Sequence, residues 1–176
     1  MVSPARVLVY VSVAGNIDPE QHLPAALEDL HAAARIRAVS TFYRTPALGR
    51  PEQPDYLNGV VAVETALPPR ALKFGLLRGI EAAHGRVRTA DTWAARTVDL
   101  DILVYGAELI EEEGLRLPDP DLGARAFLAV ALEELAPGIT PPGWPRPLSE
   151  SIDGAEAEAL VSVSAFTAYL RERFLT

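Results

Sequence analysis

The sequence predicts an α+β fold in which helices are layered on a mainly antiparallel sheet. Four apolar, β-branched runs are typical of strands, and two segments between them repeat apolar residues at helical spacing. Their order along the chain is β-α-β-β-α-β, which is the order of a ferredoxin-like fold. Further helical segments follow, so we expect a ferredoxin-like core with helical additions at its C-terminal end.

The composition indicates an apolar core and an acidic surface. The 176 residues suit one domain, and 49% of them are hydrophobic. The net charge of −8 argues against broad nucleic-acid binding, and the absence of cysteine excludes disulfides and thiolate chemistry. No apolar run approaches the ~18 residues of a membrane span, and residues 1–6 do not resemble a signal peptide. We therefore expect an unprocessed, cytoplasmic monomer that does not bind membranes.

The first half of the chain supplies three strands and one helix. Residues 6–13, RVLVYVSV, are typical of a buried strand. Asp18 and Pro19 suit the cap and first turn of a helix, although Pro24 predicts an irregular start. Two more strands and the proline-rich loop between them are expected at residues 36–43, 57–64 and 45–55.

The second half supplies a helix, a strand and the C-terminal additions. Residues 68–83 place four apolar side chains on one helical face: Leu72, Leu76, Ile80 and Ala83. A polar loop, a strand, a hairpin, a helix, a turn-rich linker and a terminal helix are expected at residues 85–95, 97–105, 109–117, 124–135, 137–147 and 164–174. We divide the chain into a domain of residues 1–137 and an extension, residues 138–176, that packs on or trails the same domain.

Two carboxylates stand at alternate positions of the fourth strand. Because side chains alternate across a strand, Asp99 and Asp101 point to one face while Leu100 and Ile102 point to the core. Carboxylates about 6–7 Å apart can share magnesium ions. A lone pair of this kind is more often a solvated strand edge, so the hypothesis depends on the residues nearby.

Those neighbours include several arginines. Arg86, Arg88 and Arg96 precede the aspartates, and Arg125 comes from the following helix. Arginine forks match phosphate oxygens, so acids, a metal and guanidinium groups together favour a polyphosphate site. Ion pairing of the arginines with the acids is the alternative interpretation. No lysine-bearing P-loop is present, since Lys73 is the single lysine.

Aromatic residues indicate a second part of the site. Tyr56 and Phe127 could stack on a flat heterocycle, although core packing is the commoner role of a single ring. Asn58 lies on the strand face of Tyr56, where its amide offers both a donor and an acceptor. Trp93 suits a loop anchor or a nucleotide contact. The three histidines show no metal-ligand spacing.

Four segments together carry a specific resemblance. They are FYRTPALG at 42–49, QPDYLNGVVAVET at 53–65, GRVRTADTW at 85–93 and RTVDLDILVYG at 96–106. Across roughly residues 6–137 the chain resembles the 6-hydroxymethyl-7,8-dihydropterin pyrophosphokinases. The resemblance implies a ferredoxin-like fold and a role in folate biosynthesis. It also implies in-line attack of the pterin hydroxymethyl oxygen on the β-phosphorus of ATP, with AMP leaving.

The resemblance further implies roles for the matching positions. Asp99 and Asp101 would bind two magnesium ions and, with Arg86 and Arg96, would form the catalytic set. The pterin would be bound by Thr45, Pro46, Leu48, Tyr56, Asn58 and Phe127. The nucleotide would be bound by Glu81, Arg88, Trp93, Ile102, Arg116 and Arg125.

Several positions depart from the pattern of that family. Ala14 begins a segment that is usually Gly-Ser-Asn, and Thr92 stands where an arginine is usual. Asp119 replaces a histidine expected near the ATP phosphates, and Gly114 replaces an arginine for which Arg116 is a candidate substitute. Each lost charge-assisted hydrogen bond is worth about 1.5–3 kcal/mol, so we expect weaker nucleotide binding.

Three functions remain open from the sequence. The paired aspartates and arginines favour an active enzyme, whereas Asp119 and Thr92 favour a relative that binds pterin but transfers phosphate poorly. An RNA-binding domain of the same fold is the third alternative. The acidic charge and the absence of a stacking motif on a strand argue against it.

Overall fold

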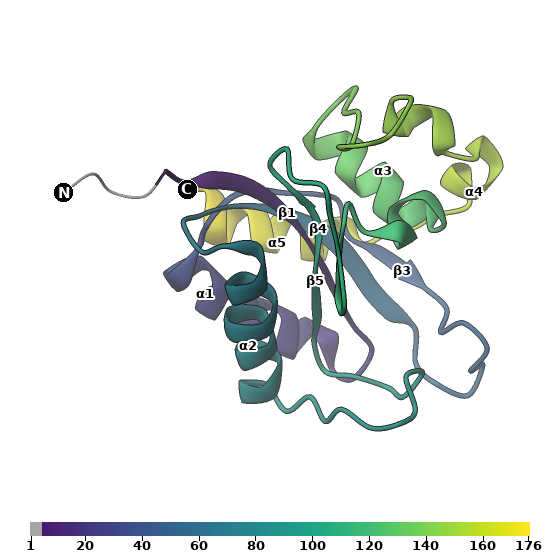
Figure 1. The fold of residues 1–176 in the computed structure, drawn as a ribbon. Helices are drawn as coiled ribbons and strands as arrows, with labels where there is room; N and C mark the ends of the chain where they lie inside the picture. Colours follow the sequence, from purple (N-terminus) through teal and green to yellow (C-terminus); the bar gives the residue numbers. More distant parts are fainter. Residues whose placement is uncertain (1–4) are drawn as a thin grey trace.

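The protein, in a computed structural model that describes residues 5–176, combines helices with an antiparallel sheet. Residues 1–4 of the expected first domain lie outside the described residues. Helices cover both faces of the sheet (Figure 1). The expected mixed α+β class is therefore confirmed. Among the described residues, no helix is both long and apolar enough to cross a membrane.

One large sheet organises the molecule. Its strand order is β5-β1-β4-β3-β8, with β2 also pairing with β4, and the pairings are antiparallel. The strands are β1 (Val7–Gly15), β2 (Arg35–Val39), β3 (Tyr43–Thr45), β4 (Tyr56–Thr65), β5 (Asp99–Tyr105) and β8 (Val161–Ser162). The two longest strands, β1 and β4, lie side by side at the centre.

Period-two alternation gives the sheet two apolar faces. Val9, Val11 and Val13 of β1 pack on one face against three helices: α1 (Pro19–Ala33), α2 (Arg78–Ala83) and α5 (Ser164–Leu175). Val60 and Leu103 point to the other face, where α3 (Ala126–Leu135) covers them. Figure 1 shows α1 and α2 on the opposite side of the sheet from α3.

Short elements complete the chain. The predicted hairpin is present as β6 (Ile110–Glu112) and β7 (Leu115–Leu117). Three further short helices are η2 (Pro120–Gly123), η3 (Leu148–Ser151) and α4 (Gly154–Glu158). The sequence predicts none of η2, η3, α4 and strand β8, because segments of two to five residues carry too little periodicity to be recognised.

The predicted second strand is two strands. The chain leaves the sheet between β2 and β3, where the Ser40 hydroxyl accepts a hydrogen bond from the N–H of Val60. Phe42 then turns into the core and fills the space above Gly59, where an added Cβ would lie 2.4 Å from the ring. The apolar pattern predicted burial correctly, but it did not predict this break.

The second predicted helix differs in its register. Residues 71–77 form a π-helix, η1 (Ala71–Leu77), that continues directly into α2. The wider turn of a π-helix rotates the following side chains, so Leu77 is buried and Ala83 is exposed. At the first helix, Asp18 has φ 40° and its side chain caps nothing, which corrects its expected capping role. Pro24 lies inside a continuous α1.

The segment after residue 137 contacts the same sheet. Strand β8 pairs with β3 at Tyr43 and Arg44. Three side chains of α5 join the core beneath β2: Phe166, Leu170 and Phe174. The predicted terminal helix is confirmed with nearly the expected bounds.

Candidate functional site

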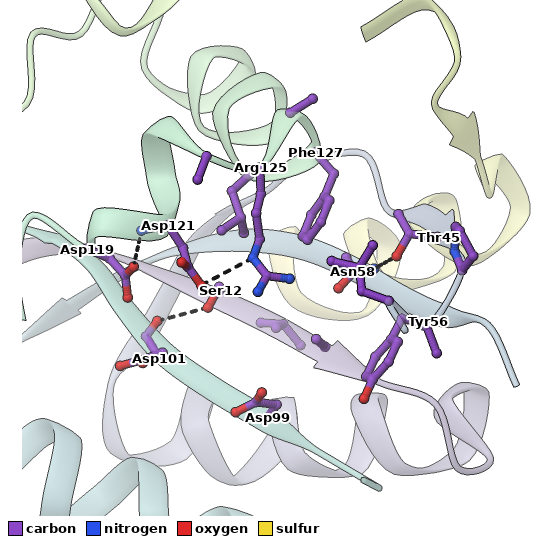
Figure 2. A pocket seen from close by; sticks show the side chains of 18 of the residues that line it. Ser12, Thr45, Tyr56, Asn58, Asp99, Asp101, Asp119, Asp121, Arg125 and Phe127 are labelled. Atoms are coloured by element: carbon purple, nitrogen blue, oxygen red, sulfur yellow. Dashed lines mark hydrogen bonds and ion pairs between the residues drawn. The ribbon is translucent and has the colours of Figure 1, made fainter. Parts of the chain in front are cut away.

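A cavity of about 720 Å³ lies between the sheet and the N-terminal turn of α3. Its floor comes from β1, β4 and β5, and the close view shows Ser12, Asn58 and Asp101 of these strands below Arg125 and Phe127 (Figure 2). The loops around Leu48 and Trp93 and the segment at residues 156–160 complete its walls. The cavity therefore collects residues from both ends of the chain.

Strand register sets the spacing of the polar groups on this floor. Ala14 of β1 pairs with Asp99 on one side and with Asn58 on the other. Neighbouring strands lie about 4.8 Å apart, so Asp99 and Asn58 stand roughly 10 Å from each other across a small alanine. Asp101 lies in the next row, opposite Ser12. The acidic end and the amide end of the cavity are thus two strands apart.

Asp99 is held by two guanidinium groups. Arg86 Nη1 lies 2.5 Å from Asp99 Oδ1, and Arg96 Nη1 lies 2.7 Å from Oδ2. Burial opposes ionisation of Asp99, but the two arginines outweigh it and hold the pKa of this carboxyl below its ordinary value. The carboxylate is therefore ionised and oriented at neutral pH.

Glu81 lies behind the cavity, buried at 1% exposure. Its carboxylate contacts Arg86 at 2.8 Å and Arg88 at 2.7 Å, and it accepts a hydrogen bond from the N–H of Leu100. Burial raises the pKa of Glu81 above its usual range, and the Leu100 N–H and Arg86 oppose that rise. Its contacts are those of a group that joins α2 to β5.

Asp101 has a different counterion. Lys73 Nζ, on η1, lies 3.0 Å from Asp101 Oδ1, and that oxygen also accepts the N–H of Ile102. The Asp101 side chain is 37% exposed and borders the cavity. Sequence reasoning missed Lys73, since no motif connects it with a strand 28 residues later.

The other end of the cavity is aromatic. Tyr56 and Phe127 both line it, from β4 and from the first turn of α3 (Figure 2). Asn58 is buried, and its amide donates to the Thr45 hydroxyl at 2.6 Å. A flat, hydrogen-bonding molecule suits this end.

Asn16, buried at the end of β1, joins the two loops that flank the cavity. Its amide donates to Gln53 and to the carbonyl of Pro54, while its oxygen accepts the N–H of Arg96. Gln53 in turn donates to the Trp93 carbonyl at 2.9 Å. A polar residue directly after a buried strand was the available signal for this hub.

Asp119 lies on the cavity wall near the acidic end. It accepts the N–H of Asp121 at the start of η2. Burial, helped by the charges of Asp101 and Asp121, raises the pKa of Asp119 to about 6, while the Asp121 N–H and Lys73 oppose that rise. Two arginines that could neutralise Asp119 are paired with other acids: Arg116 with Glu111, and Arg125 with Asp121.

The predicted site residues divide into two groups. Those that line the cavity are Thr45, Pro46, Leu48, Tyr56, Asn58, Trp93, Arg96, Asp99, Asp101, Arg125 and Phe127. Those that lie outside its lining are Glu81, Arg86, Arg88, Ile102 and Arg116. Of these, Arg86 touches Asp99, Ile102 is a core side chain, and Arg116 is exposed on the hairpin.

The donor set fits a magnesium ion that also binds a polyphosphate. Among residues 5–176, no three His, Cys, Asp or Glu side chains form a group that could hold a metal ion alone. A cation at Asp99 and Asp101 would take its remaining oxygen ligands from phosphates and water, as Mg²⁺ commonly does.

Comparison with known proteins gives consistent results. Residues 10–137 match the family model described as 7,8-dihydro-6-hydroxymethylpterin-pyrophosphokinase (HPPK). The chain is 40% identical over 139 residues to a 2-amino-4-hydroxy-6-hydroxymethyldihydropteridine pyrophosphokinase of Haemophilus influenzae, covering 77% of this chain and 86% of that protein. The protein of the same name from Pseudomonas aeruginosa is 39% identical over 137 residues, covering 76% and 83%.

Solved structures agree on the fold. A crystal structure of Plasmodium falciparum HPPK-DHPS matches with a TM-score of 0.68 at 10% identity. The match covers 99% of this chain and 48% of the other, so the chain spans about half the length of the solved protein it matches.

Proposed function

Because the chain belongs to the 7,8-dihydro-6-hydroxymethylpterin-pyrophosphokinase family, we propose that it is an ATP-dependent diphosphotransferase of folate biosynthesis. It would transfer a diphosphate group from ATP to the hydroxymethyl group of 6-hydroxymethyl-7,8-dihydropterin and release AMP. One observation carries the proposal: two carboxylates with cationic partners and an aromatic, amide-lined end share one cavity.

The pterin would occupy the aromatic end. Tyr56 and Phe127 offer ring faces, and Asn58 and Thr45 offer polar atoms to its edge. Pro46 and Leu48 close this end from the loop side. The spacing of roughly 10 Å between Asn58 and Asp99 suits a bicyclic ring whose hydroxymethyl arm points toward the acids.

The triphosphate would occupy the acidic end. Magnesium ions, two in our proposal, would be held by Asp99 and Asp101 and would neutralise charge on the phosphates. Arg96 lines the cavity and Arg86 stands directly behind Asp99, so both guanidinium groups are near the place where charge develops. Trp93 and Arg125 are the best placed of the proposed nucleotide contacts.

The chemical step needs orientation more than a strong base. The hydroxymethyl oxygen forms a bond to the β-phosphorus while the bond from that phosphorus to the α-β bridging oxygen breaks. AMP leaves with those electrons, and the hydroxyl proton passes to water. Positioning by the stacked rings and charge neutralisation by Arg86 and Arg96 would supply most of the rate enhancement.

The proposal extends to the topology of the core, the packing of the C-terminal segment and the oligomeric state. The order β5-β1-β4, with β2 and β3 following on β4, supports a ferredoxin-like core. The contacts of β8 and α5 with this sheet support one folding unit in which residues 138–176 pack on the first domain. We further propose that the protein is a cytoplasmic monomer, which light scattering and cell fractionation would test.

A second candidate function is pterin binding with weak phosphate transfer. Asp119 favours it, since this acid borders the place where the triphosphate would lie, while Arg116 and Arg125 pair with other acids. The two candidates share the pterin end of the cavity and differ at the acidic end.

A coupled assay for AMP separates the two candidates. The protein is mixed with ATP, magnesium and hydroxymethyl-dihydropterin, and both AMP and the pterin diphosphate are measured. An active enzyme should form the two products in equal amounts. Pterin binding without AMP release would support the binding protein instead. The absence of both binding and release would reject the family-based proposal for this chain.

A further inference from the structure

Lys73 reaches a candidate metal ligand from a part of the chain that carries no recognised motif. Its ammonium group lies 3.0 Å from Asp101 Oδ1, and its side chain is only 20% exposed. Lysine side chains are usually solvated, so a largely covered lysine side chain whose ammonium contacts a carboxylate is a specific arrangement.

The segment that carries Lys73 has unusual geometry. It is the π-helix η1, in which Leu72 and Leu77 are both buried. Single turns of π-helix occur frequently at functional sites, because they turn a side chain away from the α-helical register. Here the irregular turn contacts β5 and presents Lys73 to Asp101.

The other cations near the cavity have different partners. Arg96 and Arg86 hold Asp99, Arg88 holds Glu81, and Arg125 holds Asp121. Lys73 is therefore the cation that neutralises Asp101 among the described residues. Its charge also acts on Asp119, whose pKa it lowers against the larger effect of burial.

An ammonium and a divalent cation compete for the same carboxylate oxygen. A metal ion on Asp101 Oδ1 would repel a Lys73 ammonium that stayed at 3.0 Å. Lysine has a flexible four-carbon stem, so the ammonium can move a few ångströms without a change in the backbone. The nearest new anion would be a phosphate oxygen bound to that metal.

Building on the proposed function, we propose that Lys73 is a resident counterion of the metal site. It pairs with Asp101 in the ligand-free protein, leaves when a divalent cation binds, and then contacts the triphosphate. The ion pair would weaken binding of the metal alone, whereas the released ammonium would strengthen binding of the nucleotide. Lys73 would thereby favour joint binding of metal and nucleotide over binding of metal alone.

The test compares Lys73→Met with Arg70→Met. Both changes remove one positive charge near the same Phe74 ring, but Arg70 pairs with the exposed Glu112 instead of Asp101. Binding of Mn²⁺ alone is measured by electron paramagnetic resonance, and binding of α,β-methylene-ATP with Mg²⁺ is measured by calorimetry. Thermal melting establishes that each variant is folded.

We expect Lys73→Met to bind Mn²⁺ alone about tenfold more tightly and the nucleotide about tenfold more weakly. Lys73→Arg should restore the nucleotide affinity, and Arg70→Met should change Mn²⁺ affinity less than twofold. Unchanged or weaker Mn²⁺ binding by folded Lys73→Met would overturn the counterion role. Tighter Mn²⁺ binding with unchanged nucleotide affinity would overturn the phosphate contact.

The two proposals fail in different ways. The Mn²⁺ measurement needs no turnover, so a change in metal affinity would support the counterion role even in a protein that released no AMP. Conversely, the native protein could release AMP while Lys73→Met binds Mn²⁺ and nucleotide as the native protein does. That result would support the proposed enzyme activity and reject the role of Lys73.

Discussion

The buried Glu81 carboxylate accepts a hydrogen bond from the backbone N–H of Leu100 at 2.8 Å, so α2 is fixed to the strand between the two candidate metal ligands. The same carboxylate holds Arg86, which in turn holds Asp99. The chain of contacts runs from a helix through an ion pair to the floor of the cavity. Glu81 thus acts on the site without lining it.

Glu81→Gln should lower both stability and turnover. The glutamine oxygen can still accept the Leu100 N–H, but the buried Arg86 loses a charged partner. We expect a loss of about 1–3 kcal/mol in the free energy of unfolding, measured with urea. Arg88→Gln, which removes the more exposed partner of Glu81, should cost less than about 1 kcal/mol. Equal stability of Glu81→Gln and the native protein would refute this account.

Asp99→Asn and Asp101→Asn should separate activity from stability. Both should reduce AMP release at least a hundredfold, because each removes a charged oxygen ligand for magnesium. Asp99→Asn should also destabilise by about 1–3 kcal/mol, since Arg86 and Arg96 lose their shared anion. Asp101→Asn should cost less than about 1 kcal/mol, because Asp101 is partly solvated.

Two outcomes would count against that prediction. Near-native turnover of either variant at saturating magnesium would show that the metal lies elsewhere. A matched control is Asp29→Asn, which removes an exposed carboxylate that pairs with His84 and does not line the cavity, and it should leave turnover unchanged.

Tyr56→Ala and Phe127→Ala should weaken pterin binding more than ATP binding. Each ring lines the same end of the cavity, and stacking contributes about 0.5–1.5 kcal/mol beyond burial. Calorimetry with a pterin analogue should therefore show a loss of about threefold to tenfold or more. Tyr169→Ala, which removes an exposed ring on α5, serves as the control. Unchanged pterin affinity in folded variants would assign the two rings to packing alone.

Asp119→Asn should stabilise the protein in a pH-dependent way. The folded pKa of about 6 lies above the ordinary value of 3.8, so the folded state binds the proton more tightly than the unfolded state. In the native protein, protonation of Asp119 therefore favours the folded state fully below about pH 4. This contribution to the free energy of unfolding is lost as the pH rises through 6 and the carboxyl ionises. Asparagine keeps an acceptor for the Asp121 N–H but cannot ionise.

The free energy of unfolding of Asp119→Asn should consequently equal that of the native protein at pH 4 and exceed it by about 1–3 kcal/mol above pH 7. Urea unfolding at several pH values measures it. A constant difference across this range would mean that ionisation of Asp119 is not responsible.

Asp119→His should strengthen ATP binding in the presence of magnesium. The native carboxylate borders the acidic end of the cavity, and Arg116 and Arg125 are paired with other acids. A repulsion of about 3 kcal/mol per charge pair follows from ~6 Å and an effective dielectric of ~20, before solvent screening. We expect roughly tenfold tighter binding, and Asp119→Asn in the same titration separates lost repulsion from a gained donor. Equal or weaker binding by the histidine variant would indicate a site rebuilt around the acid.

Some of the site could be predicted from the sequence, because it depends on local backbone geometry. The period of two along residues 99–102 places Asp99 and Asp101 on one face and Leu100 and Ile102 in the core, as the structure has them. The order of strands and helices and the mixed α+β class followed from the same spacing rules. Departures from the family pattern, such as Asp119, could be identified from single positions of the sequence.

The tertiary structure determined which charged and polar side chains pair with one another. Lys73 meets Asp101, Glu81 meets Arg86 and Arg88, and Asn16 joins two loops, although these residues belong to separate segments of the chain. The π-turn that carries Lys73 replaced part of a predicted α-helix, and within it Leu77 is buried in place of Leu76. Spacing along a chain encodes which way a side chain points within its own element. Ion pairing depends on distances between elements, and those distances exist only once the apolar faces of the sheet have been covered.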